Sequence, residues 1–321
     1  MKLSFALALM ATTATAFSPI ATNTRVSTSL NAVTTQQIKE LREATGAGMM
    51  DCKKVLNQFD GDVAAAAEEL RKKGLATADK KASRVAAEGK IAMAQVGGRS
   101  VLVEVNCETD FVAKDDSFSK FADSAALAAA SLDSDELDAL MASDVGGSSL
   151  EDVRTNLVSK IGENIQVRRI ASRGTDSSTT GAYIHMNRIG VLVEIEGGTS
   201  ELCTDVAMHV AAMNPLYATR DDVPAEDIEK EREILTAQVA DSGKPAEIIT
   251  KMVEGRLNKF LAENCLVDQT YVKTNDRTVQ KLLEENGAKM IGFTRIMVGE
   301  GIEKKEDDFA AEVASMAAGN V

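Results

Sequence analysis

An acid and a large aromatic ring lie next to each other where a strand-like segment gives way to polar residues. Asp110 and Phe111 belong to the segment 106–114, which follows a run over 100–105 with valine at every second position. That alternation is typical of a β-strand, and the polar residues from Asp115 onward are typical of a helix start. Asp110 and Phe111 are therefore expected on a connector. A ring on a connector costs solvation free energy unless it covers a local core or enters another protein.

Few other residues have the spacing that covalent chemistry needs. The chain lacks GxxxxGK[ST], HExxH and GxSxG, the patterns of phosphate loops, zinc hydrolases and nucleophile elbows. A Cys107 and His209 nucleophile pair would need a lowered thiol pKa and an oxyanion site, and the sequence signals neither. His209 lies in an otherwise apolar helical segment, so it is either a core histidine satisfied by a neighbour or a contact at a partner surface. These observations favour a binding protein without cofactor or metal over an enzyme.

The cysteines do not suggest a metal site or a disulfide framework. Cys52, Cys107, Cys203 and Cys265 stand far apart and form no CxxC pair. They are predicted to be free thiols in a reducing compartment.

The elements that must position Asp110 and Phe111 include a repeat in the middle of the chain. Residues 101–104 and 191–194 both read Val-Leu-Val-Glu. A strand-like run precedes each copy, and an alanine-rich helix follows it, at 90–96 and 118–131 in the first copy and at 180–186 and 200–213 in the second. The first of these helices is expected to point Phe118, Phe121 and Leu127 into a core. Two related α+β halves are therefore predicted, over 90–171 and 180–300.

A small helical unit is predicted before this core. Residues 33–74 have the pattern of three short helices, and Thr34 with Gln37 forms a capping box at the first of them. Residues 75–89 are charged with little apolar periodicity, so they are predicted to be a linker, helical or flexible.

Two charged amphipathic segments interrupt the second half. Residues 225–241 and 246–262 keep mostly apolar three- and four-residue spacing, with Ile234 and Ile248 among the apolar positions, as in an antiparallel coiled-coil hairpin. The insertion covers 225–262. After it come a helix over 279–286, a strand over 291–298 and a final amphipathic helix over 303–316 within a C-terminal helical module, 301–321.

Composition limits the kind of partner. The 321 residues are enough for two or three compact units, and 44% hydrophobic with only 4% aromatic residues suggests helices packed through small side chains. The formal net charge is −13, which repels phosphate backbones and disfavours direct nucleic-acid binding. No membrane partner is expected.

The first 31 residues have the composition of a targeting presequence. Residues 1–16 follow a signal-peptide pattern whose apolar run is too short for a clear membrane span, and 17–31 are rich in Ser and Thr with Arg25 and no acid. In tandem they resemble a bipartite plastid presequence. A mitochondrial presequence, leading to the matrix, is the main alternative, and secretion is a further one; all three depend on this segment alone.

Two segments resemble signatures of the elongation factor Ts family. They are residues 45–54, Thr-Gly-Ala-Gly-Met-Met-Asp-Cys-Lys-Lys, and residues 104–114, and the resemblance extends over nearly all of the chain after residue 33. It continues through 160–164, 208–212, 242–245, 252–256 and 298–304. The resemblance implies an α+β fold with a ubiquitin-associated-like three-helix domain, a duplicated core of two subdomains, an inserted coiled-coil hairpin and a C-terminal module.

The resemblance also implies a function and a central loop. Proteins of this family bind elongation factor Tu, GDP-bound and nucleotide-free, and promote exchange of GDP for GTP. The residues matching the family's wedge are Asp110 and Phe111, which would disturb the partner's magnesium site. Thr109 and Val112 would set the turn and its packing.

Further contacts are implied at matching positions. Met49, Met50, Asp51 and Lys53 would face the partner's GTP-binding domain, although a core role for the two methionines is an alternative. Ile189, Gly190 and His209 would line the second part of the wedge surface, and Tyr271 and Val272 would grip the partner's distal domain. Residues 269–271 read Gln-Thr-Tyr where the family pattern has Gln-Pro-Phe, which puts that last contact in doubt. A ubiquitin-binding adaptor is the competing interpretation of the helical unit.

Overall fold

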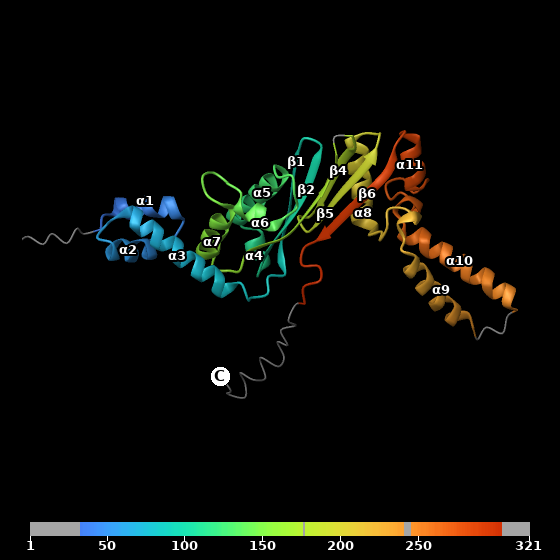
Figure 1. Cartoon of the computed structure of the whole chain (residues 1–321), viewed down its shortest axis with the longest axis horizontal. Helices are drawn as coiled ribbons and strands as arrows, with labels where there is room; N and C mark the ends of the chain where they lie inside the picture. The colour runs from blue at the N-terminus through green and yellow to red at the C-terminus, as the bar shows by residue number, and fades with distance from the viewer. Residues whose placement is uncertain (1–32, 176, 241–244, 304–321) are drawn as a thin grey trace, which may run out of the picture.

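The computed structural model describes residues 33–175, 177–240 and 245–303. The presequence expected over 1–31, and all but the first residue of the helix expected over 303–316, lie outside the described residues. Figure 1 shows a helical unit at one end of the molecule, two sheets with their helices in the middle, and a pair of helices at the other end. The fold is α+β.

The helical unit at the start of the chain has its own small core. Its helices are α1 (Thr35–Thr45), α2 (Met49–Gln58) and α3 (Val63–Lys81). The buried side chains between them are Leu41, Cys52, Val55, Leu56 and Ala66. The capping box predicted for α1 is confirmed: the Thr34 side chain accepts from the Gln37 N–H, and the Gln37 side chain accepts from the Thr34 N–H.

The segment expected over 75–89 as a helical or flexible linker is helical in its first half, because α3 continues to Lys81. Gly74 and Ala78 are buried, and a Cβ at Gly74 would lie 3.3 Å from the Ser159 hydroxyl of α7 (Leu150–Ile161). Arg71 adds an ion pair to Asp152 at 2.9 Å. This close contact holds α3 against the core, so the helix connects the two units directly.

The first half of the core is a three-stranded antiparallel sheet covered by helices. Its strands are β1 (Glu88–Val96), β2 (Arg99–Cys107) and β3 (Gln166–Arg173), in that order in the sheet. Between β2 and β3 come α4 (Asp110–Ala113), α5 (Asp116–Ala130), α6 (Leu137–Ala142) and α7. Phe118 and Phe121 of α5 are buried as expected, but Leu127 is 59% exposed and does not face the core.

The second half repeats this arrangement. Its strands are β4 (Thr179–His185), β5 (Ile189–Glu196) and β6 (Lys289–Met297), again antiparallel and in that order. The helices α8 (Ser200–Met213) and α11 (Val279–Glu285) lie between β5 and β6. The repeated motif occupies the central strand of each sheet, and both strands shift register after its glutamate, at Glu104 and at Glu194.

The insertion forms α9 (Ala225–Ala240) and α10 (Ala246–Asn264), which lie side by side (Figure 1). Leu235, Val239, Val253 and Leu257 are buried between them. Ile234 and Ile248 are about half exposed and lie outside this buried cluster, so their expected place in the seam is wrong.

The two sheets pack against each other through the faces that point away from the helices. Ile91 and Leu102 of the first half meet Leu192 and Ile296 of the second. Strand β2 is consequently buried on both faces, which corrects the half-buried strand expected from its alternation. Gly190 lies in this contact, where a Cβ would come within 2.6 Å of Ile91 Cγ2.

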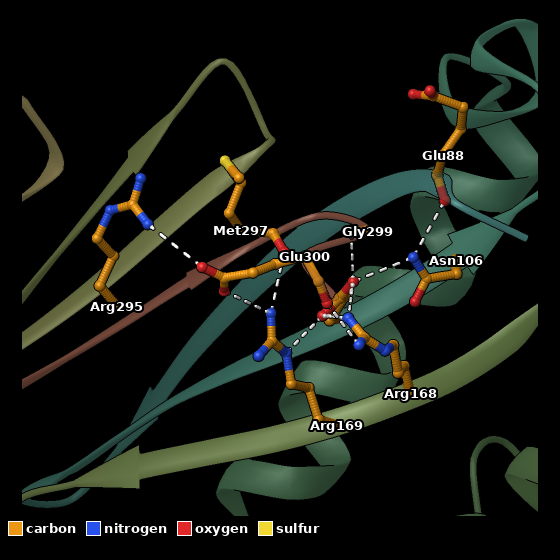
Figure 2. A network of polar contacts seen from close by, with 9 residues as sticks. Glu88, Asn106, Arg168, Arg169, Arg295, Met297, Gly299 and Glu300 are labelled. Atoms are coloured by element: carbon orange, nitrogen blue, oxygen red, sulfur yellow. Dashed lines mark hydrogen bonds and ion pairs between the residues drawn. The ribbon is translucent and has the colours of Figure 1, made fainter. Parts of the chain in front are cut away.

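Glu104 joins three segments at the junction of the halves, and Figure 2 labels its partners Asn106, Arg168, Arg169 and Gly299. Its buried carboxylate accepts from Arg169 Nε at 2.5 Å, the Gly299 N–H at 2.8 Å, Asn106 Nδ2 at 3.1 Å and Arg168 Nη1 at 3.2 Å. Burial alone would raise the pKa of Glu104, but the Gly299, Asn106 and Arg169 donors stabilise the ionised form, so its pKa lies below the ordinary value. The central strand of the first half is thereby tied to the chain that follows β6.

Candidate functional site

Phe111 is the most exposed large apolar side chain of the described residues, at 82%. It stands on α4, a helix of four residues, which replaces the irregular connector expected from the sequence. Thr109 caps this helix by accepting from the Val112 N–H at 3.4 Å. Asp110 is exposed beside Phe111 and pairs with Lys114 at 2.7 Å, and that hydrogen bond lowers the pKa of Asp110 below its ordinary value.

The loop that carries α4 is held by a reciprocal pair of carboxylates. Glu163 accepts from the Glu108 N–H at 3.1 Å, the Thr109 N–H at 3.0 Å and the Thr109 hydroxyl at 2.7 Å. Glu108 in turn accepts from the Asn164 N–H at 2.6 Å. Asn164 is buried and donates from its side chain to the Arg84 carbonyl at 2.8 Å. The two segments, 108–109 and 163–164, therefore fix each other.

The inner side of α4 rests on the first core, where Val112 and Ala113 are partly buried. Cys107, at the end of β2, donates from Sγ to the Thr109 carbonyl at 3.1 Å. Burial raises the pKa of the Cys107 thiol to about 12, so the thiolate that a nucleophile requires is suppressed. The ring points outward from a packed base.

A second exposed apolar side chain lies on a turn that contacts the same strand as α4. Met186, 79% exposed, occupies the turn between β4 and β5. That turn is bound to β1, because the Ile91 N–H donates to the Asn187 carbonyl at 2.7 Å. Since α4 also lies against β1, the turn and Phe111 flank the same strand.

The expected contact residues Ile189 and Gly190 begin β5 just after this turn. Ile189 is partly buried against the second core and Gly190 is buried between the sheets. Neither presents a free side chain comparable to that of Phe111.

His209 is fully buried, which does not fit a direct contact with a partner. The Val272 N–H donates to its Nδ1 at 3.2 Å, so Nε2 carries the proton and donates to Gln269 Oε1 at 2.9 Å. Burial lowers the pKa of His209, which keeps the ring neutral. Tyr271 is buried beside it with ring centroids 6.0 Å apart, whereas Val272 is partly exposed. The histidine therefore holds the backbone of this segment in place.

The residues expected on the helical unit are all exposed. Met49 and Met50 project outward at the start of α2, so the alternative core role for the methionines is wrong. Asp51 and Lys53 are exposed on the same helix. They form a surface separate from α4 but on a unit tied to the same core by α3.

Among the residues that the structure describes, no three or more His, Cys, Asp or Glu side chains are grouped so as to hold a metal ion. Within the same ranges, every helix is too short or too polar to cross a membrane.

Glu163 is the site residue that sequence reasoning missed. It lies 54 residues from Thr109, and nothing in its local pattern marks a role. Its only signal is its position within the segment 160–164 that carries part of the family resemblance.

Comparisons with known proteins place the chain in a family. The family model described as Elongation factor TS matches residues 108–300, which include α4, β3 and the whole second sheet but begin after β1 and β2. A protein named Elongation factor Ts from Alkalilimnicola ehrlichii is 54% identical over 291 residues, covering 90% of this chain and 100% of that protein. Proteins of the same name from Thioalkalivibrio sulfidiphilus and Xanthomonas campestris pv. campestris are 53% and 52% identical, each covering 89% of this chain. The chain belongs to the elongation factor Ts family.

Proposed function

We propose that this chain is a translation elongation factor that binds elongation factor Tu, both GDP-bound and nucleotide-free, and promotes exchange of GDP for GTP. The observation that carries the proposal is Phe111, 82% exposed on a short helix whose cap is tied to the core. An isolated ring held outward in this way costs solvation free energy until a partner covers it.

Exchange of this kind requires no covalent bond and no cofactor. If the chain binds the nucleotide-free partner more tightly than the GDP-bound partner, reciprocity requires it to weaken GDP binding by the same factor. A tenfold change needs about 1.4 kcal/mol, and burying one Phe ring supplies about 1.5–3 kcal/mol. Insertion of Phe111 would therefore weaken GDP binding by a factor of about ten to a hundred, and disturbance of the magnesium site would weaken it further.

Asp110 supplies charge next to the ring. Its lowered pKa keeps the carboxylate ionised at neutral pH, with Lys114 as its partner in the free chain. On docking, this negative charge would lie near the nucleotide's magnesium ion and compete with its ligands. Thr109 and Val112 act indirectly, by capping α4 and packing it on the core.

The other surfaces would enlarge the contact. Met49, Met50, Asp51 and Lys53, on a ubiquitin-associated-like domain, would reach the partner's GTP-binding domain. The pair α9 and α10 would form a protruding antiparallel coiled-coil arm, and residues 301–321 a C-terminal module.

In the second half, Val272 would touch the partner's distal domain, while Tyr271 and His209 would position it from beneath. Ile189 and Gly190 would support the turn that carries Met186. The net charge of −13 argues against nucleic acid as a direct partner.

The place of action is proposed to be an organelle, with the plastid stroma favoured and the mitochondrial matrix as the alternative. The bacterial relative from A. ehrlichii is covered over 100% of its length by 90% of this chain, so part of the chain has no counterpart there. Fusing residues 1–40 to a fluorescent protein tests this. Fluorescence in plastids supports the preference; mitochondrial fluorescence selects the alternative, and diffuse cytosolic fluorescence contradicts both.

The function is tested by stopped-flow release of a fluorescent GDP from elongation factor Tu of the same organism. We expect release to accelerate with increasing chain concentration and to saturate. A release rate that does not change with chain concentration would contradict the proposal, and an unrelated GTPase serves as the specificity control.

A further inference from the structure

We propose that Glu163 is a positioning residue that fixes the direction in which Phe111 points; this inference rests on the proposed exchange function. Its carboxylate gathers three donors from two consecutive residues, the Glu108 N–H at 3.1 Å, the Thr109 N–H at 3.0 Å and the Thr109 hydroxyl at 2.7 Å. Hydrogen bonds to a carboxylate are stronger than bonds between neutral groups. The loop is therefore held at the residue where α4 begins.

The Thr109 hydroxyl transmits this hold to the helix. Because its proton is donated to Glu163, its lone pairs are left to accept from the Val112 N–H at 3.4 Å. One hydroxyl thus joins the clamp to the helix cap. A single helical turn is unstable on its own, so its direction depends on such anchors.

The clamp itself has a fixed base. Glu163 follows α7, and the next residue, Asn164, is buried, donates its N–H to Glu108 at 2.6 Å and donates from its side chain to the Arg84 carbonyl at 2.8 Å. The acceptor of the loop's hydrogen bonds is consequently part of a packed region, which limits movement of α4.

The cap in the second half shows what is specific here. Thr199 caps α8 in the same way, accepting from the Leu202 N–H at 3.2 Å. Among the described residues, no carboxylate accepts from Thr199, and Gly197 and Gly198 precede it. A long packed helix needs no such clamp, whereas a one-turn helix that presents a ring does. Holding the ring in its docking direction reduces the ordering cost on binding.

The test is Glu163→Gln in the full chain, with Glu151→Gln as the control. Gln keeps the size of the side chain but offers one acceptor oxygen to three donors and turns an NH₂ group toward them. Glu151 is a hydrogen-bonded carboxylate in the same half that pairs with Arg154 at 2.5 Å; Arg154 also donates to the Ile165 carbonyl at 2.8 Å, so this control shows whether loss of a carboxylate acting near residues 163–164 is enough to alter the loop. Glu163→Asp, which keeps two acceptor oxygens, is the conservative variant.

We expect Glu163→Gln to lower the saturating GDP-release rate about tenfold while the half-saturating concentration changes less. Glu163→Asp should retain more of the rate, and Glu151→Gln should match wild type. The double variant Glu163→Gln, Phe111→Ala should be no slower than Phe111→Ala alone, because the carboxylate acts through the ring. Full additivity of the two substitutions would overturn the positioning role.

A second readout does not depend on exchange activity. Hydrogen exchange of the Thr109 and Val112 amides in the free protein should accelerate at least about tenfold in Glu163→Gln and stay unchanged in Glu151→Gln. Unchanged amide exchange in Glu163→Gln overturns the inference even if Phe111→Ala abolishes GDP release. If the wild-type chain does not accelerate GDP release from elongation factor Tu, the proposed function fails. The amide measurement still decides whether Glu163 orders α4.

Discussion

The loops that follow the two central strands begin alike and end differently. Each follows a Val-Leu-Val-Glu motif and a register shift, and each ends in a threonine that caps a helix, Thr109 in one half and Thr199 in the other. In the second half the helix α8 continues without a break from Ser200 to Met213. In the first half it ends after one turn, and a new cap at Asp115 begins α5.

The two loops also differ in the side chains that they expose. Matched from the capping threonines, Phe111 corresponds to Glu201, and both are exposed, while Val112 and Leu202 both turn inward. The shared fold thus provides the strand, the cap and the inward residue. The first loop differs from the second in three local features: a large ring at the exposed position, a helix of one turn and the hydrogen bonds to Glu163. Under the proposed function, these features make the first loop the binding loop, while the two sheets beneath keep the same strand order.

The largest difference in stability between the halves is expected at the repeated glutamates. Glu104 is fully buried with Arg168 and Arg169, whereas Glu194 accepts from Ser178 at 2.6 Å and pairs with Arg173 at 3.5 Å. Glu104→Gln should lower the free energy of unfolding by about 3 kcal/mol, and Glu194→Gln by about 1 kcal/mol. Urea titrations measure both values.

The pH dependence of Glu104 has a defined sign. Its folded pKa lies below the ordinary value of 4.5, so its stabilising contribution is full above that value and is lost as pH falls through the lowered pKa. Glu104→Gln should remove that part of the acid sensitivity. If Glu104→Gln and Glu194→Gln lowered the free energy of unfolding equally at neutral pH, the two glutamates would not differ in their contribution to stability.

The two capping threonines should differ more in function than in stability. Thr109→Ala and Thr199→Ala each remove one cap hydrogen bond, which costs about 1 kcal/mol of stability, and Thr109→Ala should cost about 1 kcal/mol more because its hydroxyl also donates to Glu163. Only Thr109→Ala should slow GDP release, because it also loses the bond to Glu163. Thermal melts and stopped-flow release are measured on the same samples. Equal slowing by both variants would mean that general stability, and not the loop, limits exchange.

The smallest effect is expected from His209, whose matched position in the first half is Ser119. Burial lowers the histidine pKa from 6.5, so below about pH 6.5 the unfolded chain binds a proton that the folded chain does not. Stability of the second half should fall as pH drops from about 6.5 toward 5, and His209→Gln should reduce that slope. Hydrogen exchange of the Val272 amide measures this stability as a function of pH. A slope that is the same in the variant would show that another group is responsible.

Patterns local in the sequence predicted local structure well. Alternating valines gave the position of β2, and the helix expected over 200–213 has the bounds of α8. Contacts between distant segments were not visible in such patterns. The burial of β2 on both faces depends on the other sheet, and the continuation of α3 depends on Gly74 meeting α7. Leu127 is exposed because, within the described part of the chain, no element covers that side of α5.

In the candidate site, too, local features could be predicted from the sequence and long-range contacts could not. Asp110 and Phe111 stand out as a local chemical anomaly, an acid and a ring on a short connection. The clamp at Glu163 requires knowledge of which distant segment lies beside the loop, and the burial of Gly190 and His209 requires knowledge of the packing around them.

The comparison of the two loops is tested most directly by GDP release with Phe111→Ala and Glu201→Ala, the matched exposed positions. Both variants should fold like wild type, since neither side chain contributes to a core. We predict that Phe111→Ala lowers the saturating release rate about a hundredfold, a loss of about 2.7 kcal/mol, and that Glu201→Ala leaves it within about twofold of wild type. If folded Phe111→Ala accelerated GDP release from elongation factor Tu as much as wild type does, that result would contradict the central claim.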